Sequence, residues 1–289
     1  MNSSSIADSI RTRLGDFSSG ERRVARALLA SYPTAGLETV RLLAERAGVS
    51  APTVLRFANR LGFANYPEFQ RSLLEELAER DQSPLNAYSS GVGEEARGRL
   101  DPEHLGRSAA ATLSEAVEET LTGIPRYELD AAVRLLSDTD RRVVACGGRF
   151  SRVLAEYLVL HLMQVRGRST VLPDSPVERA DLLSDAGRRD VFVILDFRRY
   201  EEEHLRLAEG VAEREAKVVL LTDRWLSPVS GVADVVLPAQ VGSLSAYDSL
   251  VPTMAVCEAL VAGVIHTLGD GAEERLRRFE ETSRRFGLL

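Results

Sequence analysis

The sequence has 289 residues, of which 44% are hydrophobic and 27% are charged, and its formal net charge is −7. That length is about twice the usual size of a domain, so we expect two folded units joined by a connector. The absence of an apolar run of about 20 residues, and of an apolar core near the amino terminus, argues against a membrane-spanning or secreted protein and predicts a cytoplasmic one.

Charge is distributed unevenly along the chain. Residues 1–80 carry eleven Arg against nine acidic residues, net +2, whereas the remainder carries 25 basic against 34 acidic residues. A basic and an acidic part are suited to different partners. The acidic remainder argues against a nonspecific DNA-packaging protein.

The first 80 residues predict successive helices. Ser18 and Ser19, followed by Glu21, are typical of a capped helix start, and the apolar spacing that follows runs until Pro33. Further helices are expected over residues 38–47, 51–61 and 67–80. We therefore assign residues 1–80 to an all-α domain.

A polar stretch rich in Ser and Gly follows this helical part. Residues 81–100 have the composition of a flexible connector and are assigned as an interdomain linker. The rest of the chain, residues 101–289, is assigned to a second domain, which we expect to begin with two amphipathic helices over 102–122 and 128–137.

From Arg141 onward, short β-branched runs alternate with helical stretches. Strands are expected at residues 143–146, 169–172, 191–195, 217–221 and 234–238. Helices are expected at residues 151–165, 177–184, 201–215, 246–268 and 271–285. Apolar strands separated by helices predict an α/β unit with a five-stranded parallel sheet covered on both faces.

The stretch LAERAGVSAPTVLRFANRLGF, residues 43–63, breaks at a glycine between two helices. Gly48 can adopt the left-handed turn that ends the first helix, and the small Ala44 suits a close crossing. Ser50 is placed to cap the second helix, with Pro52 in its first turn. The positions that face inward are Leu43, Ala47, Val49, Val54 and Phe57. This is the helix-turn-helix pattern.

The outward face of the second helix carries groups suited to DNA. It presents Ser50, Pro52, Thr53, Arg56, Asn59 and Arg60. Arginine pairs with guanine and asparagine with adenine, while hydroxyl and backbone N–H groups bind phosphate. The alternative is a tight helical hairpin whose arginines form a solvated face. Because many spacing constraints are met together, the pattern favours a double-stranded DNA reader.

The flanking residues extend this match to a family. SSGERRVARALL, VSAPTVLRFANRLGF and NYPEFQ resemble the amino-terminal domain of the RpiR/MurR family of bacterial transcriptional regulators. In that family the domain precedes a sugar isomerase (SIS) domain, a flavodoxin-like parallel α/β unit that binds phosphosugars. The βα pattern over residues 141–268 lies where the SIS domain is expected, so the resemblance covers nearly the whole chain.

The resemblance places a ligand at the carboxyl ends of the strands, where open parallel sheets form their crevices. Gly147 and Ser151, after the first strand, match the glycine and serine of the family's first loop, and Arg149 replaces its second glycine. Ser227, which follows the fourth strand, is a further candidate ligand-binding residue. A helix amino terminus at this loop suits an anion.

The loop after the third strand departs from the family. Where the family has a Ser- and Thr-rich phosphate loop, this chain has Asp196, Phe197, Arg198, Arg199 and Tyr200. On one interpretation Arg198 and Arg199 replace the hydroxyls as phosphate ligands. On the other the phosphosugar site is lost or changed, because the segment DFRRYEEEH is net negative and Asp196 would lie beside the phosphate. The ligand is then another anion or a non-phosphorylated molecule, or the domain only dimerises.

Catalysis is the third possibility and finds little support. Asp196, Glu201 and His204 are candidates for the acid and base of a sugar-phosphate isomerase, but the four histidines form no cluster in the sequence. Cys146 and Cys257 lack the spacing of a metal site or a disulfide framework. We therefore expect that the protein is not an enzyme and that it binds no metal and no cofactor.

The sequence therefore predicts a regulator with two partners, operator DNA and a small effector, for which the resemblance implies a phosphosugar. We expect a homodimer or homotetramer, with two reading heads facing two half-sites. Candidate interface residues are Tyr247, Leu250, Val251, Met254, Cys257 and Leu260. The alternative is that these residues cover the sheet within one subunit.

Overall fold

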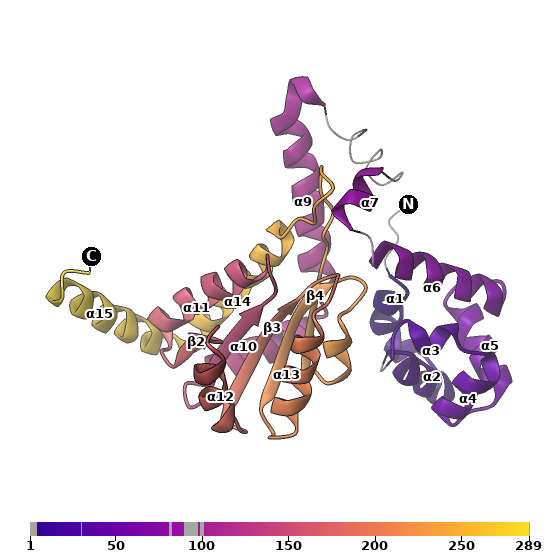
Figure 1. The fold of residues 1–289 in the computed structure, drawn as a ribbon, viewed down its shortest axis with the longest axis horizontal. Coiled ribbons are helices and arrows are strands. Elements are labelled where there is room, and N and C mark those ends of the chain that lie inside the picture. The colour runs from indigo at the N-terminus through magenta and orange to yellow at the C-terminus, as the bar shows by residue number, and fades with distance from the viewer. Residues whose placement is uncertain (1–4, 30, 81–82, 90–97, 99–100, 289) are drawn as a thin grey trace.

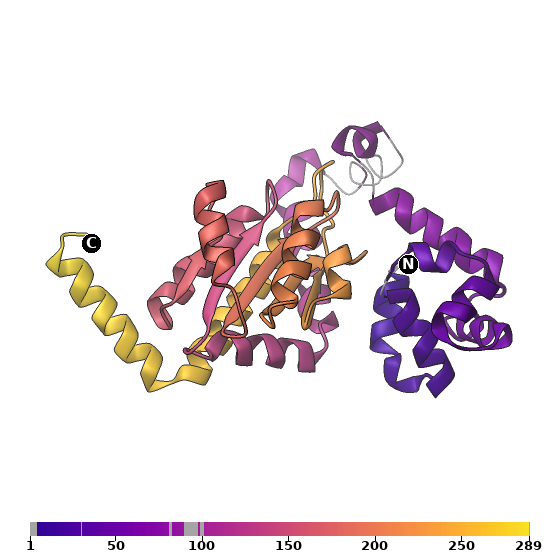
Figure 2. The ribbon, with the colours of Figure 1, turned by 60° about the horizontal axis from the view of Figure 1, so that its bottom comes forward.

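A computed structural model of the chain describes residues 5–29, 31–80, 83–89, 98 and 101–288. Figures 1 and 2 show a bundle of short helices and an α/β unit built on one twisted sheet. The predicted order of a helical part followed by an α/β part is confirmed.

The helical unit packs its short helices around one apolar core. Its elements are α1 (Ile6–Thr12), η1 (Leu14–Asp16), α2 (Ser19–Leu29), α3 (Thr34–Leu37), α4 (Val40–Ala47), α5 (Ala51–Arg60) and α6 (Tyr66–Arg80). The expected capped start of α2 is present: the backbone N–H of Ser18 donates to Glu21 Oε2 at 2.8 Å, and that of Glu21 donates to Ser18 Oγ at 3.3 Å. This reciprocal pair is a capping box.

The turn between α4 and α5 has the expected geometry. Gly48 has φ 63° and ψ 39°, and its N–H bonds the carbonyls of Ala44 and Glu45 at the end of α4. The residues predicted to face inward around it, Leu43, Ala47, Val54 and Phe57, are all buried, and Val49 packs against the same core. A left-handed residue at this position lets α5 leave α4 at a steep angle.

Part of the segment assigned as the interdomain linker is helical. Within residues 81–100, Pro84–Ser89 form the short helix α7. Proline at its first position and the Ser83 hydroxyl, which accepts the N–H of Asn86 at 3.1 Å, both favour a helix start. Most of the remaining linker lies outside the described residues.

The second unit opens with helices and is organised by its sheet. Its helical elements are η2 (Pro102–His104), α9 (Leu105–Gly123), α10 (Arg126–Ser137), α11 (Arg152–Val165), α12 (Pro176–Ser184), α13 (Glu202–Ala212), η3 (Pro228–Gly231), α14 (Val251–Leu268) and α15 (Asp270–Arg285). Its strands are β1 (Arg142–Gly147), β2 (Ser169–Val171), β3 (Asp190–Asp196), β4 (Lys217–Asp223) and β5 (Val235–Ala239). All pair in parallel, in the order β2-β1-β3-β4-β5.

The sheet is buried on both faces, as the apolar strands predict. Along β3, Val191, Val193 and Leu195 join the core under α10, α11 and α14, whereas Phe192 and Ile194 join the core under α13. Alternate residues of a strand point to opposite faces, so a strand covered on both sides is apolar throughout. The flavodoxin-like strand order brings the carboxyl ends of β1, β3 and β4 to one edge.

Helix α14 begins later than its apolar pattern predicts. Residues 246–250 belong to a loop, and α14 starts at Val251. Serine hydroxyls in this loop accept backbone N–H groups: Ser243 from Ser245, Ser245 from Tyr247, and Ser249 from Val251. Such local bonds compete with a helix. This loop, residues 240–250, is called the serine loop below.

Helix α14 also meets, by length and composition, the criterion for a membrane span, with a mean hydropathy of 1.6. In the structure it packs against α9, α10 and α11, and Val256, Leu260 and Val264 are fully buried. Its place against the sheet accounts for the apolar residues of its buried face, whereas Val251 and Ile265 remain exposed. Cys257 and Leu260 therefore cover the sheet within this chain, whereas Tyr247 and Val251 are exposed.

Candidate functional site

The outward face of α5 carries most of the predicted DNA-contacting residues. Ser50, Pro52, Arg56, Asn59 and Arg60 are exposed, so each is accessible to a macromolecular partner. Their burial pattern follows from the apolar positions of α5, which turn toward the core.

Thr53 is the exception to the predicted outward face. It is only 9% exposed, and its methyl group lies against Gly20, where an added Cβ would come within 3.1 Å. Its hydroxyl pairs with that of Ser50 at 3.0 Å and accepts a bond from Arg56 at 3.2 Å. Ser50 stands at the N-cap position, but its side chain makes no capping bond. Thr53 thus orients Arg56 and faces inward.

Arg60 is partly held by its own domain. Its Nη1 lies 3.3 Å from Glu21 Oε2, and Arg60 keeps 46% of its side chain exposed while Glu21 keeps 7%. Burial acts to raise the pKa of Glu21, but the bonds from Ser18 and the charge of Arg60 lower it on balance. Glu21 therefore stays anionic and restrains Arg60.

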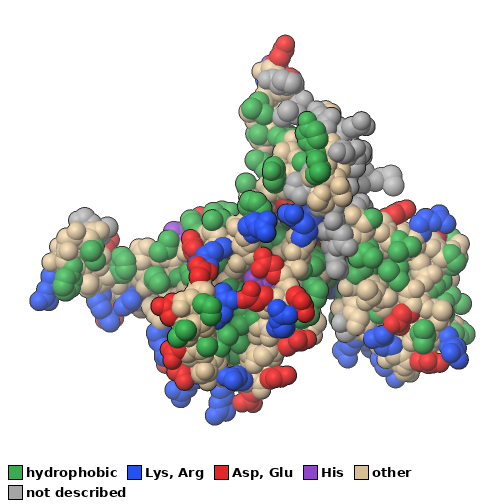
Figure 3. Space-filling view, in the orientation of Figure 1, with side chains coloured by type: hydrophobic (Ala, Val, Ile, Leu, Met, Phe, Trp, Pro, Cys, Tyr) green, Lys and Arg blue, Asp and Glu red, His purple; other side chains and the backbone are tan. Residues whose placement is uncertain are grey.

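A cavity of about 770 Å³ opens at the carboxyl ends of the strands of the α/β unit. Three loops form it: those after β1 and β3, and the serine loop before α14. It is lined by Gly148, Arg149, Phe150, Ser151, Asp196, Phe197, Arg198, Arg199, Glu201, Ala246, Tyr247, Asp248 and Leu250. Figure 3 shows acidic and basic side chains interspersed over the middle of this unit. The size suits a small-molecule ligand.

The loop after β1 is shaped by backbone contacts. An added Cβ at Gly147 would lie 2.8 Å from the backbone nitrogen of Arg152, so only glycine fits there. Gly147 does not line the cavity, so its predicted role as a ligand-binding residue stays a prediction. Ser151 Oγ accepts the N–H of Gly148 at 2.9 Å and donates its proton to the carbonyl of Leu195 at 2.7 Å. Ser151 thus joins two loops, and its proton is not offered to a ligand.

Asp196 is the centre of a buried polar network at the end of β3. Asp196 is 2% exposed; its Oδ1 lies 2.9 Å from His204 Nδ1, and its Oδ2 accepts the hydroxyl of Ser227. Ser227 is fully buried and does not line the cavity, so the structure gives no support to its predicted ligand role. It follows β4 as expected, but its hydroxyl turns toward Asp196. His204 Nε2 lies 3.9 Å from Glu201 Oε2.

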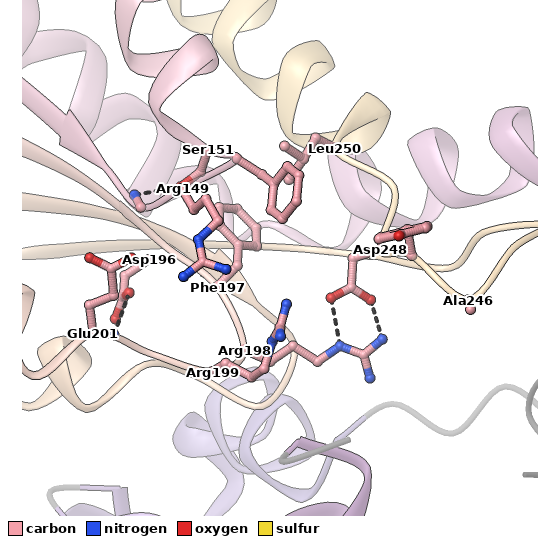
Figure 4. Close-up of a pocket in the computed structure, with 13 residues that line it drawn as sticks. Arg149, Ser151, Asp196, Phe197, Arg198, Arg199, Glu201, Ala246, Asp248 and Leu250 are labelled. Carbon is pink, nitrogen blue, oxygen red and sulfur yellow. Dashed lines mark hydrogen bonds and ion pairs between the residues drawn. The ribbon is translucent and has the colours of Figure 1, made fainter. Parts of the chain in front are cut away.

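The two neighbouring arginines of the β3 loop differ in their partners. Arg198 makes a two-pronged pair with Asp248, with Nε donating to Oδ2 at 2.6 Å and Nη2 donating to Oδ1. Figure 4 shows this pair bridging the β3 loop and the serine loop. The backbone N–H of Arg198 donates to Asp223 Oδ2 at 2.5 Å. Arg198 is therefore anchored, and its charge is balanced by Asp248.

Arg149 and Arg199 also line the cavity. Their guanidinium groups make no hydrogen bond or ion pair with any other described residue. They come from different loops and both are exposed. Arg199 has a φ of 65°, a left-handed conformation that costs an arginine about 1 to 2 kcal/mol. Strained residues of this kind cluster at ligand sites.

The acidic residues that follow the β3 loop point mostly away from this cavity. Glu202 pairs with Arg206 at 2.9 Å, and Glu203 pairs with Arg179. Of the three successive glutamates, Glu201 alone lines the cavity. Two of the four negative charges of the segment DFRRYEEEH are thus paired outside the cavity, so the net charge of the segment disfavours an anion less than the sequence indicates.

Asp223, at the end of β4, is a buried acid beneath the β3 loop. Burial raises the pKa of Asp223 to about 7, against the lowering effect of bonds from Tyr200 Oη and the N–H groups of Arg198 and Trp225. In the unfolded chain the carboxyl group of Asp223 loses its proton near pH 3.8. Between these pH values the folded protein holds more protons, so a rise in pH favours unfolding.

We expect this linkage to appear in the free energy of unfolding. Relative to Asp223→Asn, which cannot titrate, the wild-type chain should lose stability between about pH 5 and pH 7, by at most about 1.4 kcal/mol per pH unit. Denaturant titrations of both proteins at several pH values measure the difference. Parallel pH profiles would show that Asp223 is ionised throughout this range.

The serine loop supplies cavity residues that the sequence analysis missed. Tyr247, Asp248 and Leu250 line the cavity, but they fell inside a predicted helix and Asp248 was not considered. Serines at positions 243, 245 and 249 were the signal for a loop, since closely spaced hydroxyls favour local turns over a helix.

Comparison with known proteins identifies both units. Residues 4–80 match the model of the helix-turn-helix domain of the rpiR family, and residues 135–263 match that of the SIS domain. The HTH-type transcriptional regulator HexR of Pseudomonas aeruginosa is 25% identical over 96% of this chain and 95% of its own. The uncharacterized HTH-type regulator YfhH of Escherichia coli is 28% identical over 57% of each chain.

Solved structures share the fold. The sugar isomerase domain of an RpiR transcription factor from Sphaerobacter thermophilus superposes with a TM-score of 0.57 and 26% identity, covering 61% of this chain and 98% of that one. The Vibrio vulnificus NanR protein, complexed with ManNAc-6P, gives a TM-score of 0.52 and 18% identity over 98% of this chain and 99% of its own. The expectation of a regulator rather than an enzyme agrees with the names of these relatives.

Proposed function

This chain belongs to the rpiR family of helix-turn-helix transcriptional regulators, and we propose that an anionic sugar metabolite, a sugar phosphate, binds its SIS domain and controls its binding to DNA. The observation that carries the proposal is the presence of Arg149 and Arg199 on two loops of one cavity, each with a guanidinium group that has no partner among the described residues. A guanidinium group forms charge-assisted, two-pronged bonds with phosphate.

The charges of the cavity support an anion. Arg198 and Asp248 balance each other, and the carboxylate of Asp196 is bonded to His204 and Ser227. The remaining lining charges are those of Arg149, Arg199 and Glu201. Two cations and one carboxylate suit a ligand that combines an anionic group with hydroxyls. The sugar phosphate in the NanR complex has this chemistry.

Contacts at the base of the serine loop offer a route from the cavity to the DNA-binding unit. The N–H of Gln240 donates to Thr120 Oγ1 at 2.9 Å, and Thr120, on α9, is 3% exposed. Helix α9 is the first long helix after the linker. A ligand that moves the serine loop would therefore act on the helix that leads back to the reading head, provided it binds the two arrangements unequally.

The ligand proposal is tested by thermal unfolding of the full chain with sugar phosphates, the corresponding unphosphorylated sugars and inorganic phosphate. A ligand at a hundred times its Kd adds about 2.7 kcal/mol of stability. Stabilisation by one sugar phosphate and not by its parent sugar is the expected result. Stabilisation by unphosphorylated sugars alone, or by nothing in the panel, would favour a changed ligand or a domain that only dimerises.

For the DNA-binding unit we propose that α5 lies in the major groove, with Arg56, Asn59 and Arg60 reaching the DNA. Ser50 and Pro52, at the exposed start of α5, are proposed to approach the phosphate backbone. The homodimer or homotetramer that would present two heads to two half-sites stays a prediction. Exposed apolar residues on α11 and α14, namely Val153, Leu160, Val251 and Ile265, are available for such pairing.

Replacing Arg56 with Ala should cost about 1 to 3 kcal/mol of binding to a selected operator if Arg56 reads a guanine, and should relax specificity at that one base. Fluorescence titrations against the operator and its single-base variants measure both effects. Arg71→Ala is the matched control, because Arg71 is an exposed arginine on α6 of the same unit. Equal weakening on all sequences would make Arg56 a phosphate contact.

A further inference from the structure

The two-pronged pair between Arg198 and Asp248 joins two loops that line the same cavity. Its side chains are 13% and 24% exposed, and one of its bonds is 2.6 Å long. A carboxylate offers the guanidinium two oxygens in one plane, the same arrangement that a phosphate group offers. Asp248 therefore occupies the position on Arg198 that an incoming anion would take.

The two partners are held unequally. Arg198 is fixed through its backbone by Asp223, and its guanidinium lies 5.2 Å from the centre of the Trp225 ring. Asp248 lies in the serine loop, between Tyr247, which is 62% exposed, and the Ser249 turn that precedes α14. If the pair opens, the contacts with Asp223 and Trp225 keep Arg198 directed into the cavity.

We propose that Asp248 is an internal competitor for the effector's anionic group and thereby a specificity-determining residue. It holds Arg198 in the free protein, and the anionic group of the effector displaces it. This inference rests on the proposed function, since it takes an anion as the ligand of the cavity.

The competition gives the cavity a way to select its ligand. A neutral sugar cannot replace Asp248 on Arg198, and a monoanion only exchanges one carboxylate-like contact for another. A phosphate dianion brings more charge and a third oxygen, so it gains binding energy on displacing Asp248, whereas a neutral sugar or a monoanion does not. Specificity of this kind comes from a repulsive element built into the site, here the carboxylate of Asp248.

The test is the affinity of the full-length chain for inorganic phosphate, measured by isothermal titration calorimetry. If Asp248 occupies Arg198 about 90% of the time, Asp248→Asn should tighten phosphate binding by about tenfold, because apparent affinity scales with the competent fraction. Asp248→Ser is a second variant with the same expected direction. Thermal unfolding of each variant shows that it is folded before titration.

Glu201→Gln is the matched control, since it removes one negative charge from the same cavity without breaking a two-pronged pair with an arginine. A general effect of charge would tighten binding equally in both variants. Competition predicts a larger gain for Asp248→Asn, and predicts that this excess disappears in the Arg198→Ala background, a double-mutant cycle on the pair.

Four outcomes would overturn the inference. Weaker phosphate binding by Asp248→Asn would make Asp248 a residue that positions the loop, and a gain no larger than that of Glu201→Gln would leave only a field effect. If phosphate binding depends on Arg149 and Arg199 but is unchanged by substitution of Asp248, the role of Asp248 as a competitor is rejected and the proposed function stands. Absence of phosphate binding in every variant would reject both.

Discussion

Replacing Arg149 and Arg199 together with Ala should reduce the affinity for the sugar phosphate that stabilises the wild-type chain by about 100-fold or more. A hydrogen bond to a charged group contributes about 1.5 to 3 kcal/mol, which is roughly 10- to 150-fold for each guanidinium. Both groups line the cavity, and neither has to break a pair with another described residue before it binds.

Calorimetric titration of the double variant measures this loss. Arg188→Ala combined with Arg189→Ala is the matched control, because both arginines are exposed in the same unit and lie outside the cavity lining. The control should bind with the wild-type affinity to within a few-fold. An unchanged affinity in the Arg149 and Arg199 variant would remove the main support for an anion in this cavity.

The second large effect is expected in the core of the DNA-binding unit. Phe57→Ala should cost about 3 to 5 kcal/mol of stability, the usual range for a fully buried phenylalanine. Phe57 is 1% exposed, and its ring centre lies 5.1 Å from that of Phe17. The cavity left behind would lie directly under α5, so DNA binding should be lost along with the local fold.

Denaturant unfolding and operator binding measure these two losses, and ligand-induced stabilisation of the same protein shows whether the SIS domain is intact. Leu55→Ala is the control, because Leu55 lies on the same helix but is 42% exposed. We expect it to change stability by about 0.5 kcal/mol or less. A loss of less than about 1 kcal/mol in Phe57→Ala would contradict the packing described for α5.

The sequence predicted the elements well where one physical signal dominated. The apolar run at residues 191–195 lies within β3, because a strand buried on both faces must be apolar along its whole length. The turn at Gly48 was predicted because a helix-turn-helix needs a left-handed residue there, which glycine adopts without strain.

Prediction of the site was less successful because contacts distant in sequence decide where a polar side chain points. Ser227 lies at the predicted sheet edge, yet its hydroxyl is used by Asp196, 31 positions earlier. Helical spacing places Thr53 on the outward side of α5. It is buried because Gly20 of α2 has no side chain, so the methyl group of Thr53 packs against the backbone there. The pairing of Arg198 with Asp248, 50 residues apart, has no local signature.

The proposed regulation depends on the coupling between two binding events. A ligand that changes DNA affinity must bind the DNA-bound and free arrangements with different affinities, and the same factor then applies in both directions. The serine loop is central to this coupling, because it carries Asp248 at the cavity and bonds to Thr120 of α9 at its other end.

The most direct measurement is the affinity of the full-length chain for an operator fragment selected from random DNA, with and without a saturating sugar phosphate identified by thermal unfolding. We expect a change of about 5- to 150-fold, the usual range of allosteric coupling, and no change with the parent sugar. An operator affinity that is identical with and without the bound sugar phosphate would contradict control of DNA binding by this ligand.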